Sequence, residues 1–217
     1  MDKKIILKDQ IGVQEEINIQ NESEYLITSN KEKSVQLLGA SDLNFNDIID
    51  ILISLHMVLE ISLNALYRHL SLLSIKKNIG EIQIRENIDN IDFINKTILF
   101  IYNSNFNFNG KLTKAKEYHK IINTIKDFSG IRNKLIHGHS IVRIQDGDGA
   151  RFDSALRRDI NLKFLGKQIK KFRFILKGMC FYLDCLDSNL TEQDKNNLKQ
   201  RYLDDRFLPV CSFDSEP

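Results

Sequence analysis

The chain has 217 residues, of which 42% are hydrophobic and 28% are charged, and its formal net charge is +2. The apolar content excludes an intrinsically disordered chain, and the length suits one compact domain with appendages. Because the charge is nearly balanced, only its distribution along the chain can indicate a nucleic-acid partner.

The first third of the chain contains an irregular arm and a long apolar segment. Residues 1–40 mix polar clusters with short strand-like runs such as EYLITS at 24–29, which predict an arm that either adds a strand or two or packs over a helical core. A helix is predicted over 44–74, ended by lysines and Gly80. Residues 51–73 have the length of a membrane span but include side chains that would be costly in lipid, so we predict a buried helix in a cytoplasmic protein and no membrane partner. These side chains are His56, Glu60, Asn64, Arg68 and His69.

Four further helices and one turn are predicted in the rest of the chain. Apolar periodicity indicates helices over 87–102 and 113–137. Residues 140–154 alternate on both sides of a Gly-rich turn, which is typical of a short β-hairpin. A strongly amphipathic helix follows over 161–186, and a last helix over 191–202 begins with a weak capping box.

Together these elements predict an all-α protein, a bundle of four to five helices with a short inserted β-hairpin. The domain organisation expected is an N-terminal arm at 1–40, a helical domain at 41–190, and a C-terminal helix and tail at 191–217. The three cysteines match no zinc spacing and are expected to be reduced structural thiols.

One short segment, IRNKLIHGHS at residues 131–140, joins an arginine to a histidine. Cleavage of RNA without a metal needs a group that titrates near neutrality at the 2′-hydroxyl and a cation on the phosphate, and Arg132 and His137 supply both types. Five residues of an ideal helix turn through about 140°, so the two side chains converge only if the helix ends at His137 or a wide cleft receives both. Gly138 favours such an end.

The residues RNKLIHG, 132–138, resemble the Arg-x4-6-His signature of HEPN domains, small all-α bundles found widely in prokaryotic toxins and anti-phage systems. As an arrangement of helices, the resemblance covers roughly residues 44–186. It implies a HEPN-like bundle, a homodimer with both motifs in one cleft, and metal-independent cleavage of RNA that leaves a 2′,3′-cyclic phosphate, with no cofactor. In that role His137 would transfer the proton, Arg132 would bind the scissile phosphate, and Asn133 would orient one of them.

His139 marks a departure from one group of this family. Toxins paired with a nucleotidyltransferase antitoxin often continue the motif as His-x-Tyr, and the tyrosine is the residue that is modified. Here His139 stands at that position, and we retain it only as a supporting residue. An antitoxin or regulatory partner is expected from the resemblance, but not this mode of neutralisation.

Polar side chains recur every fourth residue along the long apolar helix, and Glu60 and Asn64 are two of them. Polar groups of a buried helix must find partners in the core or across a cleft. If the helix that carries the motif lies against this one, Glu60 or Asn64 can orient His137. Contacts between residues i and i+4 on a partly hydrated flank are an equally good explanation.

Basic residues are concentrated from 140 to 180, where there are ten against four acidic residues. Such an excess can follow an RNA backbone without reading its sequence, although a basic helix face is often simply solvated. The predicted RNA-binding residues are Arg143, Arg151, Lys163, Lys167, Lys170 and Lys171.

Two other interpretations of the motif stay open. The chain is then either a non-catalytic HEPN-like RNA-binding or protein-interaction module, or the motif is an ordinary helix end, in which Lys134, His137 and Gly138 follow dipole and capping preferences. A metal site is not predicted, because no carboxylate or cysteine at ligand spacing completes a pair made by His137 and His139.

Overall fold

The computed structural model shows an all-α protein. It describes residues 21–77, 91–105, 115–136, 142–143, 153–154, 160–186 and 190–208. The helices after the helical segment 21–38 are α2 (Phe45–Lys77), α3 (Phe93–Asn105), α4 (Ala115–Ile136), α6 (Leu162–Asp184) and α7 (Glu192–Tyr202). The predicted helices over 44–74, 113–137, 161–186 and 191–202 are thereby confirmed to within a few residues.

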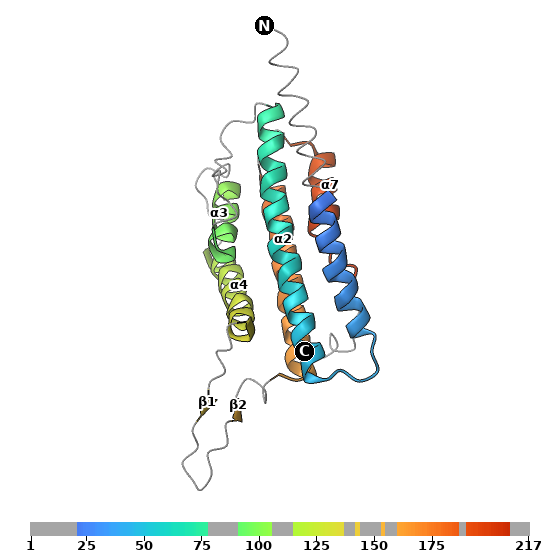
Figure 1. Ribbon diagram of the computed structural model, residues 1–217. Coiled ribbons are helices and arrows are strands. Elements are labelled where there is room, and N and C mark those ends of the chain that lie inside the picture. The colour runs from blue at the N-terminus through green and yellow to red at the C-terminus, as the bar shows by residue number, and fades with distance from the viewer. Residues whose placement is uncertain are drawn as a thin grey trace.

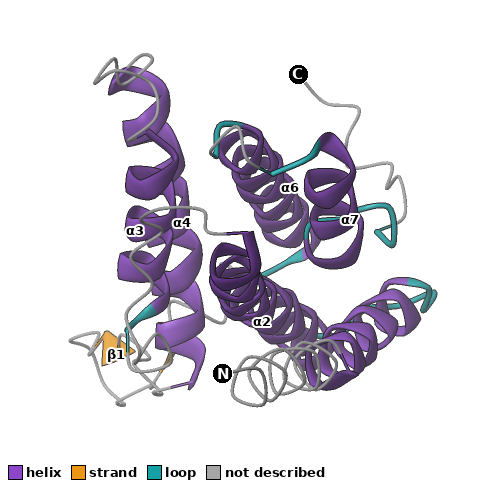
Figure 2. Ribbon diagram, turned by 90° about the horizontal axis from the view of Figure 1, so that it is seen from above, coloured by secondary structure: helices purple, strands orange, loops and turns teal. Residues whose placement is uncertain are grey.

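α2 is the central helix of the bundle. Figures 1 and 2 show α3 and α4 on one side of it, with α6, α7 and the helix at 21–38 around the rest. Leu55, Leu59, Leu63 and Leu66 are fully buried, because α2 is apolar nearly all round and must be covered on several sides. By length and composition residues 45–70 could also cross a membrane, but 61% of the apolar window is buried inside this protein.

The helix at 21–38 corrects the prediction of short strands in the N-terminal arm, because the run at 24–29 is helical. Ile27 and Ser34, which lie two turns apart, are buried on one side, whereas Tyr25 is 73% exposed. Lys33 forms an ion pair of 3.1 Å with Asp50 of α2. Contacts of this kind outweigh a weak local strand preference, and the described residues contain six helical segments instead of four or five. Residues 1–20 lie outside the described part.

Local capping determines where two of the helices begin. α3 starts at Phe93, later than predicted, and the Asp92 carboxylate accepts the Asn95 backbone N–H at 3.0 Å. α7 starts after Thr191 with the predicted capping box, in which Thr191 and Asp194 each accept a hydrogen bond from the other's backbone N–H.

The predicted hairpin is described only at its ends. β1 (Val142–Arg143) and β2 (Asp153–Ser154) pair antiparallel, with Val142 opposite Ser154. The residues between these two strands lie outside the described part of the chain, so the turn itself stays a prediction.

α4 and α6 pack closely and run antiparallel. Lys120 lies 5.0 Å from the ring centre of Phe174, and farther along α4 the Asp127 carboxylate lies 3.4 Å from Lys171 Nζ. A Cβ atom built on Gly178 of α6 would lie 2.0 Å from Cδ1 of the buried Ile121, so the absence of a side chain permits this approach.

We expect Gly178→Val to lower the free energy of unfolding by about 1–3 kcal/mol, since Ile121 must be displaced from a packed core. Gly130→Val is the matched control, because a Cβ atom there meets nothing within 4 Å, and its effect should stay within about 0.5 kcal/mol. Urea unfolding of both variants measures the difference. Equal effects at the two positions would contradict the packing described for Gly178.

Candidate functional site

The structure describes one part of the predicted motif and not the other. Arg132 and Asn133 lie in the last two turns of α4, whose bounds end at Ile136. His137, His139 and Arg151 lie outside the described residues, as does the side chain of Arg143. The described site is therefore the arginine half of the motif and its surroundings.

Arg132 is half-buried, and within the described residues part of its guanidinium has no hydrogen-bond acceptor. Its Nη1 donates to the Asn133 side-chain carbonyl at 3.0 Å, and Asn133 itself is exposed. The role that the resemblance implies for Asn133, orienting Arg132 or His137, stays a prediction. Arg132 Nε is buried and has no hydrogen-bond partner within the described part of the chain. Donors of a half-buried guanidinium that find no partner in the protein are suited to an anionic ligand.

His56 of α2 lies beside this arginine. Its ring is 2% exposed and stacks on Phe128 of α4 at 5.8 Å between ring centres. Its Nε2 lies 3.4 Å from the Ser129 hydroxyl. Burial, and secondly the positive charge of Arg132, lower the pKa of His56 from 6.5 to about 4. His56 is therefore neutral at pH 7.

Glu60 lies one turn along α2 from His56. Its carboxylate Oε2 is 3.7 Å from His56 Nδ1, which is beyond hydrogen-bond distance. The two groups are within the range of an ion pair. The pKa of His56 is lowered all the same, because the Glu60 side chain is 29% exposed and water partly screens its charge, so that burial and the charge of Arg132 outweigh it. The described contact of Glu60 is therefore with a neutral histidine near Arg132. Its predicted role in orienting His137 stays a prediction, because His137 lies outside the described residues.

Asn64 belongs to a different polar contact. Its side-chain carbonyl accepts a hydrogen bond from Lys96 Nζ at 2.7 Å, and Lys96 of α3 is 1% exposed. The Tyr67 hydroxyl donates to the Lys96 backbone carbonyl, also at 2.7 Å. The described contacts of Asn64 therefore tie α2 to α3, and the predicted role of Asn64 beside His137 remains untested.

Sequence reasoning did not single out His56 or Ser129 for the site. Ser129 is 4% exposed and lies one turn before Arg132 on α4. The spacing of three residues to Arg132 could have indicated a shared face. That α2 packs against this face could not be predicted from local sequence, because His56 and Ser129 are 73 positions apart in the chain.

The predicted RNA-binding lysines divide into two groups. Lys163, Lys167 and Lys170 are exposed on α6, whereas Lys171 is half-buried with its Nζ 3.4 Å from the Asp127 carboxylate. The first three remain available to an external anion, and the charge of Lys171 is already compensated.

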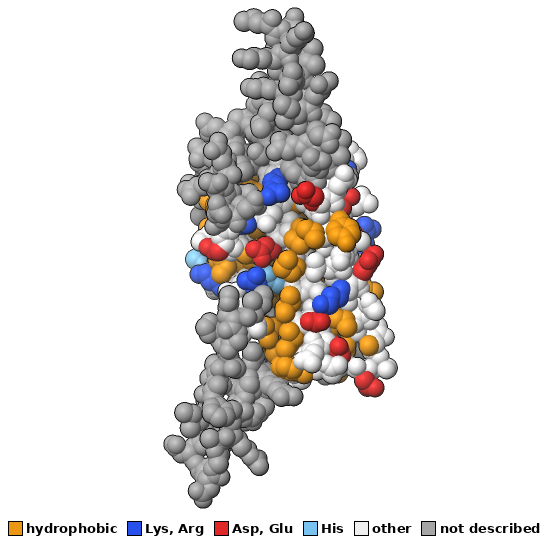
Figure 3. All heavy atoms as spheres, viewed as in Figure 1, with side chains coloured by type: hydrophobic (Ala, Val, Ile, Leu, Met, Phe, Trp, Pro, Cys, Tyr) orange, Lys and Arg blue, Asp and Glu red, His pale blue; other side chains and the backbone are white. Residues whose placement is uncertain are grey.

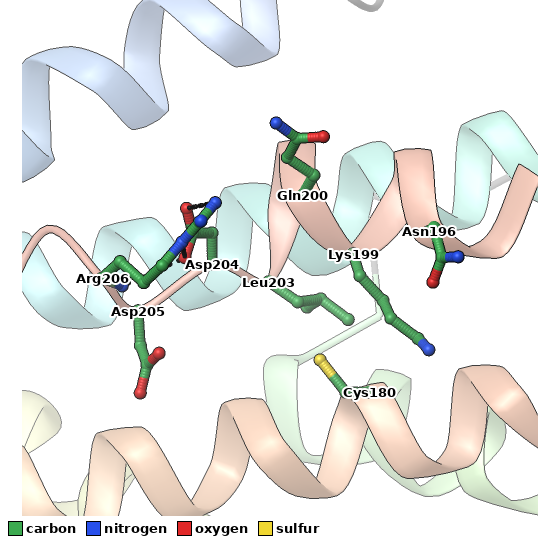
Figure 4. Close-up of a pocket in the computed structure, with 8 residues that line it drawn as sticks. All are labelled: Cys180, Asn196, Lys199, Gln200, Leu203, Asp204, Asp205 and Arg206. Carbon is green, nitrogen blue, oxygen red and sulfur yellow. Dashed lines mark hydrogen bonds and ion pairs between the residues drawn. The ribbon is translucent and has the colours of Figure 1, made fainter. Parts of the chain in front are cut away.

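A separate pocket lies between α6 and α7, with a volume of about 460 Å³. Figure 4 shows the Cys180 side chain together with residues of α7 and of the segment that follows it. Burial raises the pKa of Cys180 to about 11, so its thiol is protonated at neutral pH. Lys199 is paired with Asp184, and Arg206 with Asp204. Because these charges are matched internally, the pocket is a weaker candidate than the Arg132 site.

No group of three or more metal-ligating side chains occurs among the residues that the structure describes. No protein-family model, curated protein or solved structure matches the chain. The function must therefore be inferred from the residues themselves.

Proposed function

We propose that this protein is a metal-independent endoribonuclease of the HEPN type, acting in a toxin or anti-phage role. The observation that carries the proposal is the half-buried Arg132 guanidinium, which has a buried Nε without a partner in the described chain and lies five residues before His137. A cation with free donors stabilises the charge that develops on a phosphate during cleavage.

The proposed reaction divides the chemistry between two side chains. His137 accepts the proton of the 2′-hydroxyl, whose oxygen attacks the adjacent phosphorus, and the bond to the 5′-oxygen breaks to leave a 2′,3′-cyclic phosphate. The departing 5′-oxygen takes a proton from solvent and becomes the 5′-hydroxyl of the second product. Arg132 binds the non-bridging phosphate oxygens. His56, which is near Arg132 and neutral, carries no negative charge that would compete with the phosphate for the guanidinium.

A second copy of the chain is part of the proposal. Half-buried apolar side chains recur every fourth residue along one flank of α2, and Figure 3 shows hydrophobic side chains gathered along the same face of the bundle. The flank is made of Ile49, Ile53, Met57 and Ile61. Since Glu60 borders it, a homodimer formed there would cover apolar surface next to the Arg132 site and bring two motifs together.

The test is cleavage of total RNA and tRNA by the purified protein in EDTA, with chemical mapping of the product ends. We expect a 2′,3′-cyclic phosphate at the 3′ end of the fragment upstream of each cut and a 5′-hydroxyl on the fragment downstream of it, because no hydrolytic water or metal takes part in the first step. Products with 3′-hydroxyl ends, or activity that disappears on chelation, would contradict this mechanism. Binding of RNA without any product would favour the non-catalytic module.

A further inference from the structure

The outward face of α6 combines lysines with two aromatic rings. From Leu162 to Leu183 this helix has no acidic residue, and its opposite face is buried in the core. Six residues on the outward face follow one another at alternating spacings of four and three, and we call this row the α6 stripe. It consists of Lys163, Lys167, Lys170, Phe174, Lys177 and Phe181.

The spacing makes the α6 stripe narrow and nearly straight. At 100° per residue the six positions fall within an arc of about 80°, and at 1.5 Å per residue they span about 27 Å. That length corresponds to roughly eight nucleotides at the 3.4 Å spacing of a stacked strand. The stripe is therefore long enough to hold an oligonucleotide.

Ion pairing separates the α6 stripe from the other cations of the helix. Lys171 and Arg173 lie off the stripe, and they approach Asp127 at 3.4 Å and Asp205 at 3.9 Å. The four lysines of the stripe are exposed and form no ion pair with a described carboxylate. Positive charge is thus left uncompensated only along this line of α6.

The two aromatic residues of the α6 stripe are accessible from outside the bundle. Phe181 is 49% exposed and meets the ring of Tyr182 edge to face at 5.3 Å. Phe174 is half-buried, and Lys120 of α4 lies 5.0 Å from its ring centre. A phenylalanine ring that is accessible beside a lysine offers a flat surface on which a base can stack while its phosphate meets the cation.

We propose that the α6 stripe binds single-stranded RNA, with phosphates on the lysines and unpaired bases stacked on Phe181 and Phe174. The choice of RNA over DNA rests on the proposed function. A single strand is favoured because the faces of its bases are free, whereas a duplex covers them. A membrane surface fits less well, because the other large apolar residues of the helix are mostly buried in the core and two rings seven positions apart make no continuous apolar face.

The α6 stripe also leads toward the Arg132 site. Because α4 and α6 are antiparallel, the end of α4 that carries the motif lies at the same end of the bundle as the start of α6 (Figure 1). Exposed Lys134 lies two turns beyond Asp127 on the same flank of α4. A strand that follows the stripe from Phe181 to Lys163 therefore arrives beside the motif.

The test is fluorescence anisotropy with a labelled oligouridylate of about 12 nucleotides and with an RNA duplex of the same length. The protein carries His137→Ala, so that binding is measured without cleavage. We expect Lys163→Gln, Lys167→Gln and Lys170→Gln together to weaken binding about tenfold or more. The slope of log affinity against log salt concentration should become shallower by about 2, which corresponds to roughly three lost phosphate contacts on a single strand. Phe181→Leu should weaken binding of the single strand about fivefold or more, and the duplex much less.

A charge-matched control removes three exposed cations elsewhere, Lys33→Gln, Arg201→Gln and Arg206→Gln, and should bind as the parent does. Equal weakening by both triple variants, or equal affinity for duplex and single strand, would overturn the proposal. The proposal would also be overturned if the stripe variants bound RNA as the parent does but no longer bound vesicles of anionic lipid, because the stripe would then be a membrane-binding surface. If the wild type cuts no RNA but the stripe variants bind oligouridylate more weakly, RNA binding by the α6 stripe is supported and the proposed nuclease activity is refuted. If the wild type cuts RNA but the stripe variants bind oligouridylate as tightly as the parent, the nuclease activity is supported and the role of the stripe is refuted.

Discussion

Replacing His137 by alanine is expected to lower the rate of RNA cleavage by about 10²–10⁴-fold, because the proton of the 2′-hydroxyl then has no acceptor at the motif. The measurement is the initial rate of cleavage of one labelled tRNA in EDTA at neutral pH. His119→Ala is the matched control, since His119 is an exposed histidine of α4 and lies outside the motif. Circular dichroism and the apparent mass in gel filtration should be unchanged in both variants.

The companion variant Arg132→Gln should reduce cleavage by about 10²–10³-fold, since it removes the cation proposed for the phosphate. It has a second readout that does not depend on activity. Because the charge of Arg132 helps to lower the pKa of His56, the pKa of His56 measured by NMR should rise in this variant. Lys126→Gln, an exposed cation of α4 that lies outside the motif, is the control for both readouts.

The cleavage rate tests the catalytic roles of His137 and Arg132, and the pKa of His56 tests whether Arg132 lies close to His56. Cleavage that survives both His137→Ala and Arg132→Gln would refute the catalytic assignment, whatever the pKa of His56 does. A His56 pKa that stays near 4 without Arg132 would instead show that the charge does not reach the ring. Lost cleavage with a raised pKa is the result that the proposal requires.

Acid should destabilise the protein through His56 by about 3 kcal/mol between pH 7 and pH 4. The pKa of His56 is 6.5 ordinarily and about 4 in the folded protein, so in this window the unfolded chain binds a proton that the folded protein does not. The contribution of His56 to the free energy of unfolding is therefore complete above pH 6.5 and is lost as the pH decreases toward 4. Urea unfolding at a series of pH values measures the slope.

His56→Gln should flatten that slope, because glutamine does not titrate and can still reach the Ser129 hydroxyl. The stability of the variant at pH 7 is expected to be lower, since the ring contact with Phe128 is lost, so the comparison is between slopes. His119→Gln provides the control on an exposed histidine. If His56→Gln and wild type lose stability in parallel as the pH falls, His56 is not the group that binds the proton.

The boundaries of the main helices followed from the sequence alone. Apolar spacing predicted α2, α4 and α6 closely, and Thr191 with Asp194 predicted the start of α7, because periodicity and caps are determined by neighbours along the chain. The proposal of Arg132 as the phosphate-binding cation also came from the sequence, and the structure adds that its Nε is buried without a partner in the described chain.

Other features depended on contacts between distant residues. The run at 24–29 has a weak strand preference, and it becomes helical because Ile27 is buried and Lys33 pairs with α2. His56 reaches Ser129 across 73 positions of chain, and only the packing of α2 on α4 makes its ring neutral beside Arg132. Which cations of α6 remain uncompensated was likewise decided by Asp127 and Asp205, because ion pairing requires proximity in space, which no local pattern encodes.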